Sequence, residues 1–458
     1  MAVSGIILAA GKGTRMKSDS PKVLCNMLFK PLVQWVVDAS REAGVQDLCV
    51  VTGHGRQQVM QALEGQCEFA VQEQQLGTGH AVQQCAEFLK QHQQDTVVLL
   101  CGDTPLIESE TIKALCAFHA QEGNSATVLI GKMEDPTGYG RVIRDGWGDV
   151  TAIVEQKDAT EEQKAVREIN SGIYAFKGAH LLEALGQLSN NNAQKEFYLT
   201  DTISILSKSG HRVGGFVCED QAQIMGINDR VQLYEAQQIA KERIFRRLQI
   251  AGVTIYDKAS TFIAPDAVIG EDTEILPGTI IRQGCTIGRG CVIGPQTDLR
   301  QMTIGDHTSM DRTVAIESTV GEYVTAGPFT YIRPNCHIGN HIKVGDFVEV
   351  KNANVGDGCK LPHLSYIGDS DLGEGINIGC GTVTCNYDGK RKHRTTIGSR
   401  SFIGCNTNLV APVTVEEGAY IAAGSTITDT VPKDNFSIAR ARQVNKEDWK
   451  KKREESNK

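Results

Sequence analysis

A branched aliphatic residue returns at every sixth position over long stretches in the second half of this chain. The first stretch comprises Ile263, Ile269, Ile275, Ile281, Ile287 and Ile293. An antiparallel strand alternates every two residues and an α-helix repeats about every 3.6, so neither keeps every sixth residue inside a core. Coils built from three short sides of six residues do. The period therefore predicts a β-solenoid, the fold class expected from about residue 251 to 437.

The same period continues toward the C-terminus, with interruptions. It returns at Ile332, Ile338, Val344 and Val350, and again at Ile397, Ile403, Leu409, Val415, Ile421 and Ile427. Between these stretches the register slips by a residue, and an insertion occupies about Thr384–Thr396. Irregular segments of a solenoid become loops, and loops carry functional residues. We therefore expect a site near these interruptions.

Residues 1 to about 227 alternate short apolar runs with helical stretches. The runs are Gly5–Ala10, Asp47–Val51, Glu68–Val71, Thr96–Cys101, Ala126–Gly131 and Gly172–Phe176. This alternation predicts an α/β, Rossmann-like domain with a mostly parallel sheet. A connecting helix is expected over 228–250, and the charge-dense segment 438–458 is expected to be solvated and partly disordered. In such sheets ligands bind beyond the carboxyl ends of the strands.

The composition limits the class of protein. The formal net charge of −8 gives no reason to expect nucleic-acid binding, so an anionic ligand must be held by local positive groups. The 14 cysteines include no CxxC pair, and no long apolar segment follows the start of the chain. We expect a cytoplasmic protein without membrane insertion and without a zinc site.

A glycine-rich segment follows the first predicted strand. It reads Leu8-Ala9-Ala10-Gly11-Lys12-Gly13-Thr14-Arg15-Met16, and Lys22 comes soon after it. Small residues let backbone N–H groups approach a phosphate, and Arg15 and Lys22 supply positive charge. The segment is neither a Walker A loop nor a Rossmann G-x-G-x-x-G motif. Taken alone, an ordinary glycine-rich turn remains an alternative.

Two further motifs, QEQQLGTGHA at 72–81 and Gly102-Asp103-Thr104-Pro105, follow other predicted strands. Four more come later in the chain: Gly138-Tyr139-Gly140-Arg141, Val154-Glu155-Gln156-Lys157, Asn170-Ser171-Gly172 and Gly226-Ile227-Asn228. In this order they resemble the uridylyltransferase branch of the sugar nucleotidyltransferases. The resemblance implies a uridylyltransferase domain over 1–227, in which a sugar 1-phosphate attacks the α-phosphorus of UTP and pyrophosphate leaves. Cys101 stands where that family more often has Tyr.

The resemblance also implies roles for individual residues. Asp103 and Asn228 would bind Mg²⁺, a hard cation that takes few protein oxygens beside phosphate and water. Arg15 would be catalytic by neutralising phosphate charge. The nucleotide and sugar would be held by Leu8, Ala9, Ala10, Gly11, Lys22, Gln72, Gly77, Thr78, Gly140, Glu155, Asn170 and Asn228.

Polar residues depart from the aliphatic pattern of the solenoid near its interruptions. The segments that contain them are Arg333-Pro334, EVKNA at 349, HLSYIGD at 363, INIGCGTVTCNYDGK at 376 and LVAPVTV at 409. They resemble the acetyltransferase half of the bifunctional family that makes UDP-N-acetylglucosamine. The resemblance implies a left-handed parallel β-helix that assembles as a homotrimer. It also implies transfer of the acetyl group of acetyl-CoA to glucosamine 1-phosphate, followed by uridylyl transfer from UTP.

Within this resemblance His363 would be the general base, Asn386 would position the amine and the Tyr387 N–H would receive the oxyanion. The sugar phosphate would contact Arg333, Lys351, Tyr366, Asn377 and Lys392. Acetyl-CoA would contact Cys380, Asn386, Tyr387, Cys405, Ala423 and Arg440. The basic insertion would reach a neighbouring subunit. Two other readings stay open: a monofunctional nucleotidyltransferase with a purely structural solenoid, and a trimeric scaffold that binds nucleotide sugars.

Overall fold

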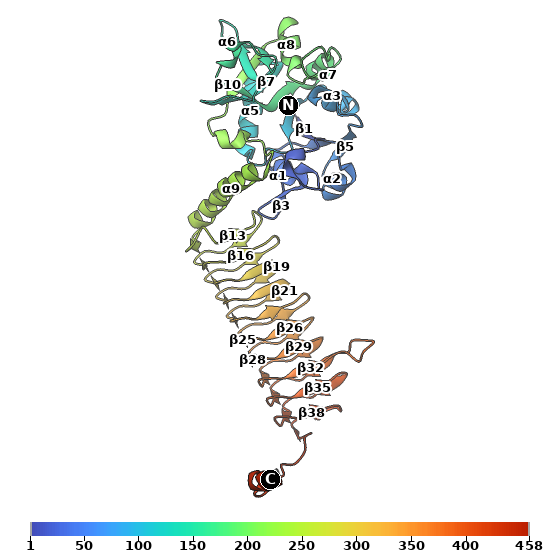
Figure 1. Cartoon of the computed structure of the whole chain (residues 1–458), viewed down its shortest axis with the longest axis vertical. Helices are drawn as coiled ribbons and strands as arrows, with labels where there is room; N and C mark the ends of the chain where they lie inside the picture. The colour runs from blue at the N-terminus through green and yellow to red at the C-terminus, as the bar shows by residue number, and fades with distance from the viewer. Residues whose placement is uncertain (1, 457–458) are drawn as a thin grey trace. The chain divides into compact units, whose positions relative to one another are not determined.

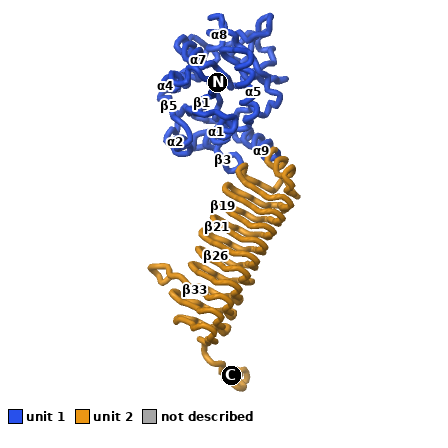
Figure 2. The backbone as a smooth tube through the Cα atoms, turned by 180° about the vertical axis from the view of Figure 1, so that it is seen from behind, with its two compact units in different colours: residues 1–242 blue, residues 243–458 orange. Residues whose placement is uncertain are grey.

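The computed structural model describes residues 2–456 and divides the chain into two compact units, Met1–Glu242 and Arg243–Lys458 (Figure 2). Helix α9 (Arg230–Ile250) contains the boundary between them. Each unit has its own sheets, and the predicted fold class, an α/β domain followed by a β-helix, is confirmed (Figure 1).

The first unit is built on one mostly parallel sheet in the order β11-β7-β10-β6-β1-β4-β5. Its strands are β1 (Val3–Ala9), β4 (Asp47–Thr52), β5 (Glu68–Val71), β6 (Thr96–Cys101), β7 (Ala126–Lys132), β10 (Glu168–Lys177) and β11 (Val213–Val217). Five of the six predicted runs lie within these strands, and the sixth, Gly5–Ala10, extends one residue beyond β1. Strand β10 runs antiparallel to β6 and β7, and β8 (Arg141–Arg144) and β9 (Val150–Val154) form a further antiparallel pair.

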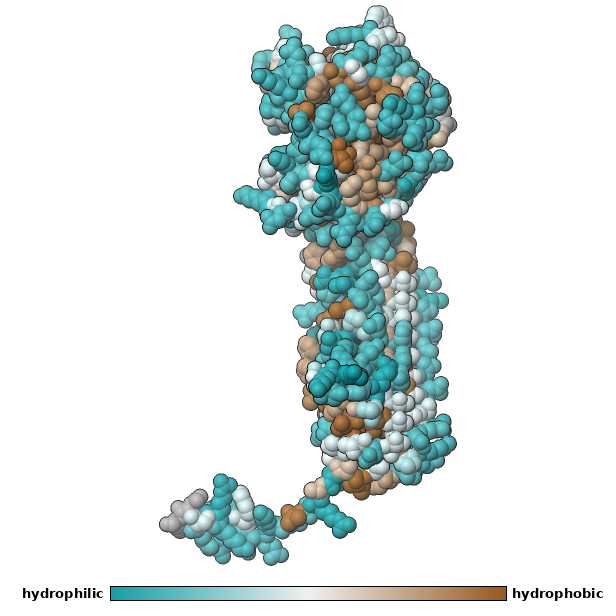
Figure 3. All heavy atoms as spheres, turned by 90° about the vertical axis from the view of Figure 1, so that its right-hand side faces the viewer, coloured by the Kyte–Doolittle hydropathy of each residue, from teal (hydrophilic) through white to brown (hydrophobic). Residues whose placement is uncertain are grey.

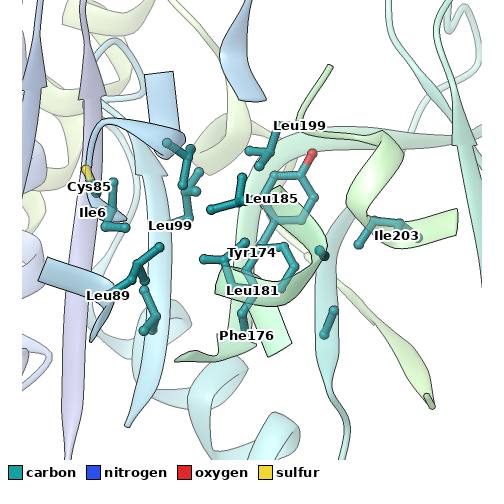
Figure 4. Close-up of a cluster of buried hydrophobic side chains, with 14 of the residues drawn as sticks. Ile6, Cys85, Leu89, Leu99, Tyr174, Phe176, Leu181, Leu185, Leu199 and Ile203 are labelled. Carbon is teal, nitrogen blue, oxygen red and sulfur yellow. The ribbon is translucent and has the colours of Figure 1, made fainter. Parts of the chain in front are cut away.

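Both faces of this sheet are buried under helices. The main helices are α1 (Leu32–Glu42), α2 (Arg56–Ala62), α3 (Thr78–Gln83), α4 (Ala86–Gln91), α5 (Ser109–Gln121), α7 (Gly178–Leu185) and α8 (Asp201–Lys208). Neighbouring residues on β6 point to opposite cores, Leu99 into one and Leu100 into the other. Figure 4 shows Leu99 packed with Tyr174 and Phe176 of β10. Burial on both faces explains why these strands are continuous apolar runs.

The second unit is a parallel β-helix that runs from β12 (Thr254–Ile255) to β39 (Phe436–Ser437). Each described strand pairs in parallel with the strand one coil away; for example, Phe262 pairs with Ile280, eighteen residues later. The sixth-position aliphatics point inward, and Ile263, Ile281 and Val350 are each 0% exposed. Burying one such side chain contributes roughly 1.5–3 kcal/mol. The aliphatic residues that recur at every sixth position therefore form the hydrophobic core that stabilises the β-helix.

The predicted interruptions are present. Seventeen residues instead of eighteen separate the paired Asp346 and His363. The insertion leaves the β-helix after β32 (Val383–Cys385), returns at β33 (Thr395–Ile397) and projects from its side (Figure 1). It folds as a short hairpin in which His393 N–H donates to the Asn386 carbonyl at 2.8 Å.

Part of the charge-dense C-terminal segment has regular secondary structure. Residues Trp449–Ser456 form helix α10, whose residues are exposed and mostly hydrophilic (Figure 3). The residues of this segment are mainly good helix formers, and the Arg453 guanidinium lies 5.1 Å from the centre of the Trp449 ring. Local propensity therefore orders the backbone although the side chains remain solvated. Within residues 2–456 no helix has both the length and the apolar character needed to cross a membrane.

Candidate active sites

Asp103 and Asn228 lie together beyond the carboxyl end of β6. The Ile227 N–H donates to the Asp103 carbonyl at 2.8 Å, which fixes the two segments side by side. The Lys22 ammonium contacts the Asp103 carboxylate and lies 3.2 Å from Asn228 Oδ1. The positively charged Lys22 ammonium therefore lies between the two side chains that are predicted to bind Mg²⁺. This donor set, one carboxylate and one amide oxygen, fits a hard cation that takes its other ligands from phosphate and water.

The glycine-rich segment holds Lys22 at this position. Gly13 has a left-handed φ of 59°, and a Cβ there would lie 2.4 Å from Lys22 Cβ. Arg15 is exposed in the turn Thr14–Met16, whose Met16 side chain is buried, and Leu8, Ala9 and Ala10 lead into this turn from β1. The segment therefore packs against its own lysine and leaves Arg15 accessible to a ligand.

Gln72 is buried beside the start of α3, with 5% of its surface exposed. Its amide nitrogen lies 3.0 Å from the Gly77 carbonyl, and Gln75 donates to the Ala10 carbonyl at 2.6 Å. A cavity of about 300 Å³ opens here. Its lining residues are Lys12, Gly53, His54, Arg56, Gln72, Glu73 and Gln75. The Thr78 hydroxyl accepts from the Leu199 N–H at 3.2 Å, so Thr78 also supports the loop structure.

Gly140, Glu155 and Asn170 converge from three separate segments. The Asn170 N–H donates to the Gly140 carbonyl at 2.9 Å, and a Cβ on Gly140 would lie 3.5 Å from Glu155 Oε1. Burial raises the pKa of Glu155, whose carboxylate accepts from the Thr200 hydroxyl at 3.3 Å. The half-buried Glu155 carboxylate, next to Gly140, is suited to accept a hydrogen bond from a sugar hydroxyl or amide. Arg141 of the same motif is instead buried, and donates to Gln156 at 2.7 Å.

Cys101, the departure from the more common Tyr, packs in the interior. Its thiol lies 3.4 Å from the Gly172 carbonyl, and burial followed by the neighbouring Asp103 charge raises its pKa to about 12. A neutral, unreactive thiol adds no charge beside the Asp103 carboxylate, so Cys101 does not compete with that carboxylate for a cation.

In the β-helix, His363 ends β28 (Lys360–His363) and faces the coil before it. Its Nδ1 lies 2.6 Å from Asp346 Oδ1, at the end of β25 (Lys343–Asp346). The His363 side chain is 54% exposed, so it lies at the surface of the β-helix, where a substrate can approach it. Asp346 was not among the residues predicted from the sequence.

A buried carboxylate, Asp369, joins several of the predicted residues. It accepts from Asn352 at 2.5 Å and from Asn386, and its Oδ2 lies 3.8 Å from the Lys351 ammonium. Burial opposes its charge, but these amides and ammonium groups outweigh that effect and lower its pKa. Asp369 therefore stays ionised and positions Lys351 and Asn386. It too was missed from sequence.

Lys392 of the insertion lies beside Lys351 of the same chain, whose ammonium lowers the pKa of Lys392. Two ammonium groups share one carboxylate, which leaves a local excess of positive charge suited to a phosphate. Tyr366 joins this group because its hydroxyl lies 3.3 Å from Asn386 Nδ2. Arg333 lies on an earlier coil and forms an ion pair with Glu349 at 2.8 Å.

Tyr387 begins the hairpin of the insertion and forms a bridge with Lys392. Hydrogen bonds of residues 388 and 393 flank this pair, so it is a non-hydrogen-bonded antiparallel pair. Among the described residues, none accepts a hydrogen bond from the Tyr387 N–H. This N–H is therefore available to a ligand.

Three of the residues predicted to contact acetyl-CoA, Cys380, Cys405 and Ala423, form a file on successive coils. Ile378, Ile403 and Ile421 are paired in register, which places Cys380, Cys405 and Ala423 one above another, each two residues further along. The Arg440 side chain passes 3.5 Å from the Cβ position of Gly424. Asn377 begins β31 (Asn377–Ile378) on the same side of the coil. Small side chains and one arginine thus line a continuous strip.

Comparison with known proteins decides the family. A model described as nucleotidyl transferase matches residues 4–224, and one described as bacterial transferase hexapeptide (six repeats) matches residues 266–297 and 394–429. The bifunctional protein GlmU of Clostridioides difficile is 49% identical, over 99% of this chain and 98% of its own length. That of a Geobacillus species is 50% identical, over 97% and 96%. The chain belongs to the GlmU family.

Membership of the GlmU family confirms the function expected from the motifs. The chain is a bifunctional enzyme with nucleotidyltransferase and acetyltransferase activities, and it makes UDP-N-acetylglucosamine. The readings as a monofunctional enzyme and as a binding scaffold are thereby excluded. The roles of individual residues, the metal and the oligomeric state are separate questions.

Gly77 provides a test of the nucleotide loop. Its φ is 109°, and a Cβ would lie 2.6 Å from the Phe197 carbonyl oxygen. We expect Gly77→Ala to strain the loop by about 1–3 kcal/mol and to lower uridylyl transfer about tenfold or more, without affecting acetyl transfer. Gly146→Ala, where a Cβ meets nothing within 4 Å, is the control. Steady-state pyrophosphate release measures both variants, and wild-type activity of Gly77→Ala would contradict the assignment.

Proposed function

We propose that each reaction of this enzyme is carried by the residue cluster found in its own unit. Asp103, Asn228 and Lys22 would serve uridylyl transfer, and His363, Asn386 and Lys351 would serve acetyl transfer. The observation that carries the proposal is convergence within each unit: Lys22 contacts both Asp103 and Asn228, and Lys351 and Asn386 lie against the same carboxylate, that of Asp369. Lys351 and Lys392 also supply positive charge suited to a phosphorylated substrate.

For uridylyl transfer, we propose that Asp103 and Asn228 hold Mg²⁺. When bound, the metal would neutralise charge on the phosphate oxygens of UTP. Lys22 would then turn from these two oxygens to the phosphates, and Arg15 would contact them from its exposed turn. Gln72 would hydrogen-bond the uracil edge, while Gly140, Glu155 and Asn170 would hold the N-acetylglucosamine. The sugar phosphate is anionic at neutral pH, so it attacks without a protein nucleophile.

For acetyl transfer, we propose His363 as the general base. The amine of glucosamine 1-phosphate would form a bond to the thioester carbon while His363 accepts its proton. The carbon–sulfur bond then breaks and CoA leaves. The Tyr387 N–H would donate to the oxyanion, because no described residue accepts a hydrogen bond from it. Lys351 and Lys392 would bind the phosphate.

The remaining predicted residues complete this pocket. We propose that Arg333, Tyr366 and Asn377 contact the sugar phosphate. Acetyl-CoA would lie along the file of Cys380, Cys405 and Ala423, with Arg440 near a phosphate of CoA. Cys405 replaces a residue that is often Ser, and its exposed thiol is a poorer hydrogen-bond partner for the acyl donor.

We also propose that the enzyme is a cytoplasmic homotrimer that assembles through its β-helix. Phe329 and Phe347 stack on neighbouring coils at 5.4 Å, although they are 54% and 57% exposed. Leu364, on the next coil, is 58% exposed. A second copy of the chain would cover this apolar corner. The described cysteines are all free thiols, in keeping with a reducing compartment.

Purified full-length protein tests these proposals together. Thiol release from acetyl-CoA with glucosamine 1-phosphate measures one reaction, and pyrophosphate release from UTP with N-acetylglucosamine 1-phosphate measures the other. Light scattering should give three times the chain mass of 49.8 kDa. A monomer with full acetyl transfer would contradict the trimer, and pyrophosphate release that survives complete metal chelation would contradict the Mg²⁺ site.

A further inference from the structure

The contact between His363 and Asp346 is built into the backbone of two neighbouring coils. Their residues are paired in the β25–β28 register, and the Leu364 N–H donates to the Asp346 carbonyl at 2.9 Å. Gly345 lets the coils approach closely, because a Cβ there would lie 1.8 Å from the Pro362 carbonyl oxygen. The residues flanking the pair thus fix the separation of its Cα atoms.

The imidazole itself has little other restraint. Its side chain is 54% exposed, so packing does not select one orientation of the ring. The Ser365 hydroxyl donates to the His363 carbonyl at 2.8 Å, which orders the backbone but not the ring. Among the described residues, the side-chain partner of the ring is Asp346, with Nδ1 and Oδ1 2.6 Å apart.

The chemistry of this contact selects one tautomer of neutral His363. An ionised carboxylate accepts hydrogen bonds and donates none. The hydrogen bond from His363 contributes most to the lowered pKa of Asp346, and the positive charge of the nearby Lys343 also lowers this pKa. Asp346 is therefore ionised at neutral pH, and the proton of the imidazole must lie on Nδ1. The lone pair is then on Nε2, the nitrogen that faces away from Asp346.

We propose that Asp346 is a positioning residue of acetyl transfer, which orients the His363 ring and keeps Nε2 free to accept the proton of the substrate amine. This inference rests on the proposed role of His363 as general base. Asp346 does not contact the reacting atoms. Its contribution is to keep the base in the reactive tautomer and to stabilise the imidazolium that forms when the proton arrives.

Asp346→Ala tests the proposal in the full-length enzyme. We expect kcat for thiol release to fall about tenfold or more, with KM for both substrates nearly unchanged, because only proton transfer is impaired. Asp346→Asn keeps the size and an acceptor oxygen but removes the charge, so it should be intermediate. Pyrophosphate release should stay at the wild-type level in both variants. Glu317→Ala, which removes another exposed carboxylate of the β-helix, is the matched control.

A spectroscopic measurement separates positioning from a general structural role. With ¹⁵N-labelled histidine, the His363 ring should show mainly the Nδ1–H tautomer in the wild type and a shift toward Nε2–H in Asp346→Ala. The signal is assigned by its absence from His363→Ala. An unchanged tautomer and an unchanged kcat in Asp346→Ala would overturn the inference. If His363→Ala itself retains thiol release, the proposed base is wrong; if it loses thiol release and Asp346→Ala does not, only the role of Asp346 fails.

Discussion

Replacing His363 with Ala is expected to lower thiol release from acetyl-CoA roughly a hundred- to ten-thousand-fold, the range that a general base contributes. The substrate amine must lose a proton as its nitrogen bonds to the acetyl carbon. Without the imidazole, the proton passes to water, for which nothing in the site is positioned. The Lys351, Lys392 and Tyr387 contacts remain, so KM for glucosamine 1-phosphate should change little.

The second activity of the same polypeptide is the internal control for this variant. Pyrophosphate release should be unaffected, because the uridylyltransferase cluster belongs to the other unit and its core is separate. His341→Ala is a matched control, since His341 is an exposed histidine of the β-helix that stacks on Tyr323. A His363→Ala protein that lost both activities while keeping its mass and melting temperature would contradict the division between the two clusters.

Replacing Asp103 with Ala is expected to lower pyrophosphate release at least a hundredfold at ordinary Mg²⁺ concentrations, and to leave thiol release unchanged. The change removes the only carboxylate of the proposed metal site and leaves Asn228 as its one protein oxygen. It also removes the anion that pairs with Lys22, whose side chain is only 13% exposed. Loss of a charged ligand from a divalent-cation site costs several kcal/mol of transition-state stabilisation, on the order of the effect expected here.

A metal titration makes this prediction specific. Asp103→Asn keeps an oxygen at the same position without its charge, so the Mg²⁺ concentration needed for half-maximal activity should rise, and added Mg²⁺ should restore part of the rate. Binding of Mn²⁺, followed by its paramagnetic signal, should weaken in both variants. Asp103→Ala with a normal Mn²⁺ affinity and a normal rate would refute the metal assignment.

Much of the fold followed from local patterns. The strands of the first unit that are buried on both faces, such as β6 and β7, contain the predicted runs, because an uninterrupted apolar run of that length indicates a buried strand. Strands β8, β9 and β11 were not predicted. β8 has arginine at both ends and β11 contains two adjacent glycines, so pairing with their neighbours stabilises them more than their own residues do.

The candidate sites were only partly visible in the sequence. The motifs identified His363, Lys351 and Asn386, because polar residues stand out where a coil wall is otherwise aliphatic. They did not identify Asp346 or Asp369, although these two carboxylates organise the site. An aspartate in a turn of a solenoid is common, and nothing in its immediate neighbours shows which residue of the next coil it will contact.

The six-residue repeat was enough to predict a β-helix, and the motifs were enough to predict a nucleotidyltransferase sheet. Both patterns can be recognised from residues that are close together in the chain. Only the tertiary structure decided which side chains meet between coils. The separation of paired residues is eighteen at Phe262 and Ile280, sixteen at Asp298 and Val314, and seventeen at Asp346 and His363. Because a shift of one residue turns a side chain from one face of a strand to the other, contacts between coils depend on a register that the repeat alone does not specify.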